Sequence, residues 1–147
     1  MSATTEVRLA VRYQETDQMA IVYHANYLVW FEIGRTDFVK QVTGMGYPDL
    51  EKQYGVLLPV IHVEADYHAP ARYGDAILVR TRMVQFSRVR IHFAYEVLRE
   101  VDGKGEELLV TGQTHHAWVN RELKPLRLDR HAPAFFSRLQ EAMAQQP

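Results

Sequence analysis

Apolar and polar residues alternate over five segments of the chain, and this two-residue period is typical of strands with one buried face. In the first segment, for example, Val7, Leu9 and Val11 alternate with Arg8 and Arg12. The five segments are residues 7–13, 61–68, 77–86, 89–99 and 108–120. Short turns join the later ones, among them the Asp-Gly-Lys-Gly hairpin turn at residues 102–105. Consecutive strands with such connections favour an antiparallel sheet.

Two further segments have the apolar spacing of helices. Residues 27–42 predict one helix, with Asn26 as its N-terminal cap and Gly44 and Gly46 as stop signals. Residues 27–31 are apolar nearly all round, and a helix of that kind is usually buried. Residues 134–145 predict a surface helix, with Pro133 near its first turn.

Together these elements predict an α+β fold in which a curved antiparallel sheet wraps around one apolar helix. The chain has 147 residues, no internal repeat and no linker rich in proline or serine. We therefore expect a single domain over residues 1–147.

Composition narrows the classes of function. Lys and Arg total 17 and Asp and Glu total 18, and this balance argues against a nucleic-acid partner. The chain has no cysteine, which excludes disulfides, thiol catalysis, thiolate zinc sites and iron–sulfur clusters. No apolar run reaches the roughly 20 residues of a membrane helix, and no secretory signal is visible. We therefore expect a cytoplasmic protein without a membrane span.

The densest polar cluster lies just before the predicted apolar helix. Asp17 follows a strand, and His24 comes directly before the helix N-terminus, where unpaired N–H groups carry partial positive charge. Such a terminus can stabilise an oxyanion, a carboxylate beside it can attack a carbonyl or activate water, and a histidine can move protons. These parts suit an acyl-transfer hydrolase. Residue types alone, however, favour a structural alternative, in which Asp17 bonds loop amides and His24 is a satisfied, partly buried histidine.

Residues 12–35 resemble the opening motif of the hotdog-fold acyl-CoA thioesterases. The shared core is Tyr-x-Glu-Thr-Asp-x-Met-x-x-Val-Tyr-His-Ala-Asn-Tyr, here at residues 13–27, and the run at residues 66–75 also resembles that family. The 4-hydroxybenzoyl-CoA thioesterase type, including its Tol-Pal-associated branch, is the most similar. The resemblance implies a hotdog fold, in which a curved antiparallel sheet wraps a long central helix.

The resemblance also implies roles for single residues. Asp17 matches the catalytic carboxylate, which acts as nucleophile or general base. His24 matches a conserved histidine whose backbone N–H polarises the substrate carbonyl, and Tyr13 matches a tyrosine at the entrance of the site. Ala20 and Ile21 stand where the family often has glycine, which allows more backbone conformations than alanine.

A second implied region binds coenzyme A. Ser87, Arg88 and Arg90 lie at a turn that in the family often meets the nucleotide phosphates, which the planar guanidinium of arginine suits. The alternative is a surface turn with solvated arginines.

The implied activity is hydrolysis of an acyl-CoA substrate to a carboxylic acid and coenzyme A, without a cofactor or metal. The family implies a homo-oligomer, a dimer or homotetramer, with sites at subunit junctions. A hotdog dehydratase or hydratase and a non-catalytic acyl-CoA binding module are the alternatives.

Other polar groups receive structural interpretations. His62, Glu64, Asp66 and His68 alternate along one strand face, but neighbours on that face lie about 6.6 Å apart. We therefore expect a polar strand that faces solvent or another subunit, and no metal site.

The remaining charged residues and histidines are also interpreted as structural rather than catalytic. Glu32 and Arg35 are predicted to form an ion pair on the buried helix. His92, His115 and His116 are predicted to be core or interface residues.

Overall fold

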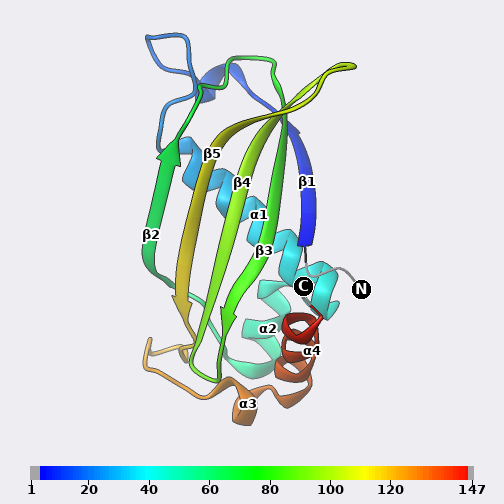
Figure 1. Ribbon diagram of the computed structural model, residues 1–147. Coiled ribbons are helices and arrows are strands. Elements are labelled where there is room, and N and C mark those ends of the chain that lie inside the picture. Colours follow the sequence, from blue (N-terminus) through cyan, green and yellow to red (C-terminus); the bar gives the residue numbers. More distant parts are fainter. Residues whose placement is uncertain (1–3, 146–147) are drawn as a thin grey trace.

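The computed structural model describes residues 4–145 and confirms the predicted fold class (Figure 1). The strands are β1 (Thr4–Ala10), β2 (Val60–Tyr67), β3 (Ala76–Phe86), β4 (Arg90–Val101) and β5 (Gly105–Ala117). The helices are α1 (Asn26–Thr43), α2 (Tyr47–Tyr54), α3 (Leu128–His131) and α4 (Pro133–Ala144), and a 3-10 turn covers Tyr13–Glu15. None of the helices within residues 4–145 is long and apolar enough to cross a bilayer.

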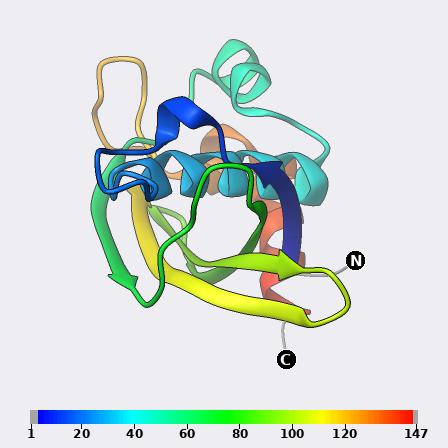
Figure 2. The same ribbon diagram turned by 90° about the horizontal axis from the view of Figure 1, so that it is seen from above.

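One antiparallel sheet contains all five strands in the order β1-β3-β4-β5-β2. The sheet curves around α1, which lies along its concave face (Figure 2). This arrangement leaves β1 and β2 as the two edge strands. The inward-facing residues of the sheet and one side of α1 form the hydrophobic core.

Close contact between α1 and the sheet depends on two glycines. A Cβ atom at Gly34 of α1 would clash with the Thr81 side chain of β3, and one at Gly112 of β5 would lie 2.6 Å from the Phe31 ring. Because Gly112 lacks a side chain, the Phe31 ring has room to stack on Tyr95, with ring centroids 4.4 Å apart. The helix is thereby held directly against the middle strands.

The N-terminal half of α1 differs from the prediction. Leu28, Val29 and Ile33 are 36–49% exposed, so this half is not buried on every side. Nor does Asn26 cap the helix: it lies inside the first turn, and its side-chain amide donates to the Glu15 carbonyl at 2.8 Å. The long-range partner at Glu15 outweighs the local preference of asparagine for a cap.

Other boundaries also shift. The first strand ends at Ala10, earlier than predicted, because Glu15 accepts the Arg12 backbone N–H at 2.8 Å and closes a 3-10 turn there. Helix α1 ends at Gly44 in the left-handed conformation, as predicted. Gly46, however, precedes the unpredicted helix α2.

Candidate active site

A pocket of about 330 Å³ lies beside the start of α1. Asp17 and His24, the two residues predicted to carry the chemistry, both line it. The other residues of its wall come from the loop before α1, from α1, and from the end of β2 with the segment that follows it: Met19, Ile21, Val22, Tyr27, Tyr67, His68, Ala69 and Pro70. The structure therefore brings the two predicted groups together in one mostly apolar cavity.

Glu15 anchors the loop that carries Asp17. Its side chain is buried, and its Oε2 accepts the Trp30 indole N–H of α1 at 2.8 Å. Burial raises the pKa of Glu15, whereas hydrogen bonds from Arg12 and Trp30 and the positive charge of Arg12 lower it. The lowering effects together are larger, so that the pKa of Glu15 lies below its usual value. The ionised carboxylate thus ties the loop to the helix and fixes where residue 17 stands.

Asp17 lies in a tight turn at residues 17–21. Its backbone N–H donates to the Ile21 carbonyl at 2.8 Å, and its Oδ1 accepts the Met19 N–H at 2.8 Å. Within residues 4–145, its Oδ2 accepts no hydrogen bond. The structural alternative therefore accounts for one carboxylate oxygen, and the other remains available to a ligand in the pocket.

Ala20 gives this turn its shape. Its φ is +63°, in the left-handed region that favours glycine. The family's frequent glycine in this loop thus has a conformational equivalent here, and alanine adopts it at some cost.

His24 lines the same pocket just before α1. Its carbonyl accepts the Tyr67 hydroxyl at 3.0 Å, while its N–H has no partner among residues 4–145. The N–H lies two residues before α1 begins, where the helix dipole adds positive potential. A carbonyl oxygen of a bound substrate would satisfy this group and gain stabilisation as negative charge develops on it.

Another part of the wall comes from a segment whose residues the sequence did not predict to be in the site. Val22 donates to the Ala71 carbonyl at 2.9 Å, and the Ala71 N–H donates to the Tyr27 hydroxyl at 3.1 Å. These bonds bring Tyr67 and His68 to the pocket. The sequence signal for them is the family-like run at residues 66–75, which contains both.

Tyr13 lies outside the pocket wall. Its side chain is 76% exposed and packs edge-to-face on Tyr73, with ring centroids 5.7 Å apart. Its role at the entrance of the site stays a prediction.

The predicted coenzyme A residues lie far from Asp17 within one chain. The β3–β4 turn that contains them is at the opposite end of the sheet from the loop before α1 (Figure 1). Ser87 Oγ accepts the Arg90 N–H at 3.1 Å, and Arg88 pairs with Asp129 at 3.5 Å. Ser87 and Arg88 line a separate cavity of about 760 Å³. A single chain therefore does not join them to the Asp17 pocket.

The remaining polar groups fall into two sets. Glu32 and Arg35 form the predicted ion pair at 3.7 Å, although Glu32 is exposed rather than buried. His116 is a core residue, as predicted, whereas His115 and His92 are only partly buried.

Comparison with known proteins gives the family. Residues 11–143 match the description "Thioesterase-like superfamily". The chain belongs to this superfamily. Among curated proteins, the thioesterase-like chain is 36% identical to the putative acyl-CoA thioesterase YneP of Bacillus subtilis, over 91% of this chain and 94% of that one.

Solved structures agree with this assignment. A DHNA-CoA thioesterase from Staphylococcus aureus superposes on the thioesterase-like chain with a TM-score of 0.88 and 34% identity, over 96% of this chain and 91% of that one. The hypothetical protein TT1821 from Thermus thermophilus gives a TM-score of 0.77 and 36% identity, over 90% and 95% of the two chains. The predicted hotdog fold is thereby confirmed.

Proposed function

We propose that this protein hydrolyses acyl-CoA thioesters to a carboxylic acid and coenzyme A, with Asp17 as the catalytic carboxylate. One observation carries the proposal: Asp17 and His24 line the same mostly apolar pocket beside a helix N-terminus, and the Asp17 Oδ2 and the His24 backbone N–H are both without partners in the described chain. The named activities of YneP and of the DHNA-CoA thioesterase support the same reaction.

The chemistry follows from these two groups. The His24 N–H would donate to the thioester carbonyl oxygen, and charge would build on that oxygen as the carbonyl carbon is attacked. Either Asp17 attacks, expels the coenzyme A thiolate and leaves a mixed anhydride that water cleaves, or Asp17 takes a proton from the water that attacks. Both routes yield an acid and a thiol, and neither requires a metal or a cofactor.

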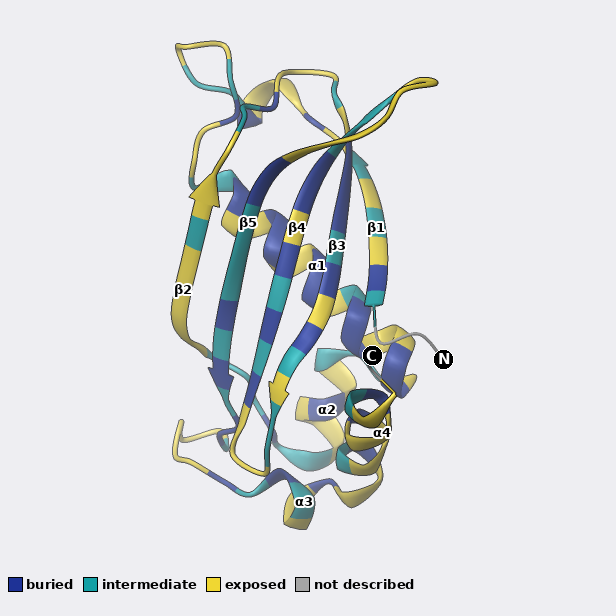
Figure 3. Ribbon diagram, viewed as in Figure 1, coloured by how far each residue is buried: buried dark blue, intermediate teal, exposed yellow. Residues whose placement is uncertain are grey.

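A second copy of the chain would complete the site. Edge strand β2 is exposed on both faces (Figure 3), and it carries the exposed apolar residues Val60, Ile61, Val63 and Tyr67. An exposed apolar edge is a liability that pairing removes. Two β2 strands that pair antiparallel about a two-fold axis would bring the partner's β3–β4 turn toward the Asp17 end of this chain. The predicted dimer or homotetramer thus explains how Ser87, Arg88 and Arg90 can reach the substrate.

The finer assignment is part of the proposal. The motif at residues 13–27 supports the 4-hydroxybenzoyl-CoA type and its Tol-Pal-associated branch. The aromatic rings of Tyr27 and Tyr67 in the pocket wall are compatible with an aromatic acyl group. A panel of benzoyl-, 4-hydroxybenzoyl-, short-chain and long-chain acyl-CoA, with release of the free thiol as readout, determines the preferred acyl group. A cytoplasmic location belongs to the same proposal, because acyl-CoA is an intracellular substrate.

The Asp17→Asn variant tests the reaction itself. We expect turnover to fall by about 1,000-fold or more, because the nucleophile or base is lost while the shape of the pocket is kept. Binding of the acyl-CoA, measured by calorimetry, should change little. Asp102→Asn, in the exposed β4–β5 turn, serves as the matched control and should keep full activity.

Two outcomes would contradict this assignment. Near wild-type hydrolysis by Asp17→Asn would remove Asp17 from the chemistry. Conversion of an enoyl-CoA without thiol release would favour the dehydratase or hydratase alternative, and tight binding without any turnover would favour a binding module.

A further inference from the structure

Three histidines form a row on the outer face of the sheet, on the side away from α1. His62 of β2 pairs with His115 of β5, and His115 pairs with His92 of β4. Cross-strand partners share a face, so that the three imidazoles lie side by side. The ring centroids of His62 and His115 are 4.6 Å apart, and those of His92 and His115 are 3.6 Å apart. None of these residues lines the Asp17 pocket.

His62 stands at the start of the regular pairing between β2 and β5. The register shifts between Val60, which pairs with His116, and His62, which pairs with His115. From His62 onward the pairing continues without a shift. The two-residue period of β2 therefore places the side chains of His62 and Glu64 on the same outer face as His115.

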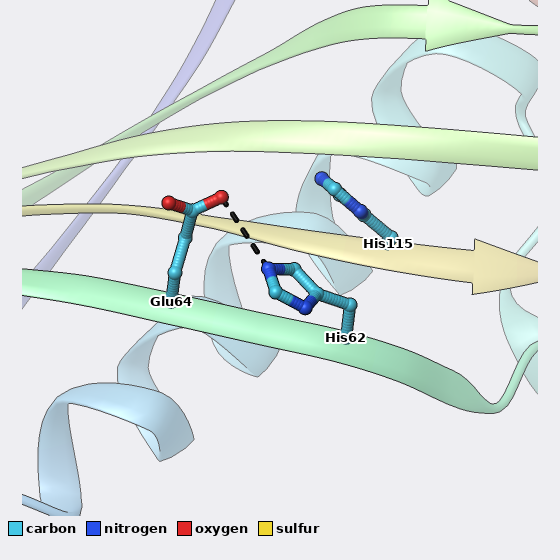
Figure 4. Close-up of side chains that lie close together, drawn as sticks. All are labelled: His62, Glu64 and His115. Atoms are coloured by element: carbon cyan, nitrogen blue, oxygen red, sulfur yellow. Dashed lines mark ion pairs between the residues drawn. The ribbon is translucent and has the colours of Figure 1, made fainter.

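Glu64 adds a carboxylate to the row. It lies two residues after His62 on the same strand face, and its Oε1 is 3.4 Å from His62 Nε2 (Figure 4). One ligand atom from each of His62, Glu64 and His115 can be chosen so that all three lie within 4.8 Å of one another. We propose that these three residues bind one divalent transition-metal ion on the outer face of the sheet, with Zn²⁺ as the best fit.

The donor set matches the preferences of that ion. Zn²⁺ takes imidazole nitrogen and carboxylate oxygen at about 2.0–2.2 Å, in four-coordinate sites where water can supply the last ligand. The side chains of His62 and Glu64 are 51% and 56% exposed, so that they can rotate inward by the small amount that such bonds need. Sites built from oxygen ligands alone suit Mg²⁺ and Ca²⁺. We therefore expect selectivity for Zn²⁺ over those two ions.

The surroundings hold the His115 ring in place. His115 Nε2 contacts Gln113 Oε1 at 3.2 Å, and the ring stacks on His92 at an interplanar angle of 9°. These contacts orient the ring, as outer-shell partners of metal-ligating histidines do. Arg90 is the cation whose charge acts against the ion here.

The ion would join an edge strand to its neighbour. Two ligands belong to β2 and one to β5, so that binding would fix β2 against the sheet at the register shift. Because the ion binds the folded chain and the unfolded chain has no preformed site, it would raise the unfolding temperature.

The experiment uses the full chain without a histidine tag, freed of metal by EDTA and gel filtration. Titration with ZnCl₂ in a calorimeter should give one ion per chain. CoCl₂ should give the visible absorption bands of a four-coordinate site, and Zn²⁺ should abolish them. Zn²⁺ should also raise the melting temperature by several degrees, whereas MgCl₂ should not.

Matched variants locate the ion. His62→Ala, Glu64→Gln and His115→Gln should each weaken Zn²⁺ binding by at least about 10-fold. Asp66→Asn, one step farther along the same strand face, and His131→Ala, an exposed histidine on α3, should bind as the wild type does. Metal-free melting temperatures within a few degrees of the wild type would show that the variants fold.

Two results would overturn the proposal. One is the absence of saturable Zn²⁺ binding by the folded wild type. The other is wild-type affinity in all three ligand variants, which would place the ion elsewhere. Because thiol release is not a readout here, failure of this test is distinct from failure of the proposed hydrolysis.

Discussion

At the scale of single residues, the turn that carries Asp17 depends on a backbone conformation that its sequence does not favour. Ala20 has a φ of +63°, and a left-handed alanine costs free energy that glycine avoids. The turn keeps this shape because Asp17 bonds to the Met19 and Ile21 backbone on both sides of it. The carboxylate that is proposed to react thus also holds a strained loop in place.

Ala20→Gly tests this strain. We expect the free energy of unfolding to rise by about 0.5–1 kcal/mol, because glycine adopts this φ without a steric penalty. Urea unfolding monitored by circular dichroism measures the change. Ala134→Gly in the first turn of α4 is the control and should lower the same quantity, because glycine is a poor helix former. A loss of stability in Ala20→Gly would mean that the turn is not strained.

At the scale of elements, the contact of α1 with the sheet depends on the absence of side chains. Gly34 faces Thr81 and Val79 of β3, and Gly112 faces Phe31. The same helix positions His24 at its N-terminal end and is held there by Trp30, which bonds Glu15. Packing along the helix and geometry at its tip are therefore connected.

Gly34→Ala makes this connection measurable. In an exposed helix the change would stabilise by roughly 1 kcal/mol. Here we expect a loss of about 1–3 kcal/mol in the free energy of unfolding, because the added methyl group overlaps the Thr81 side chain. Denaturant unfolding gives the sign directly. Gly46→Ala, where a Cβ atom would meet nothing closer than 3.6 Å, should change stability much less.

The sequence pattern predicts elements better than it predicts the contacts between them. Two-residue alternation located all five strands, although edge strand β2 is exposed on both faces. Helix α2 was missed, because it has eight residues and buries only Leu50. The Asp17 and His24 pair was foreseeable from its place beside a helix N-terminus. The Tyr67 wall was not, since it depends on the long-range bond between Val22 and Ala71.

The candidate metal site needs the neighbouring strand as well. The alternation predicted one polar strand face that carries four candidate ligands of β2. Pairing sets His62 opposite His115 of β5, and the compact group is His62, Glu64 and His115. This group could not be predicted from the pattern of a single strand, because it depends on the register with the neighbouring strand.

At the scale of the whole molecule, acid should weaken the fold through a buried histidine. Burial, followed by the nearby Arg35 charge, lowers the pKa of His116 from 6.5 to about 4. Its ring bonds the Thr114 hydroxyl within β5. It also bonds the Leu58 carbonyl, and this second bond connects β5 to the segment before β2. The unfolded chain therefore takes up this proton at a higher pH than the folded chain does.

The free energy of unfolding should accordingly fall as the pH drops from about 6.5 to about 4, by up to about 3 kcal/mol from this group. Above pH 6.5 the residue is neutral in both states and contributes no slope. Urea unfolding at a series of pH values measures the effect, and the NMR shift of the His116 ring gives its midpoint. A midpoint near 6.5 in the folded protein would contradict the argument.

The proposed dimer, in which two chains share each active site, can be tested by combining two inactive variants. If the Asp17 pocket of one chain uses the β3–β4 turn of the other, two defective variants should restore activity when mixed. Asp17→Asn removes the carboxylate, and the double change Arg88→Ala and Arg90→Ala removes the proposed phosphate contacts, so that each variant alone is nearly inactive at low acyl-CoA. Co-expression should make about half of the dimers mixed, each with one intact site, and recover about a quarter of wild-type activity.

The summed activity of the two separately purified variants is the baseline for this comparison. Activity no higher than that baseline would mean that Asp17 and the arginines serve the same chain, which the distance between them within one chain argues against (Figure 1).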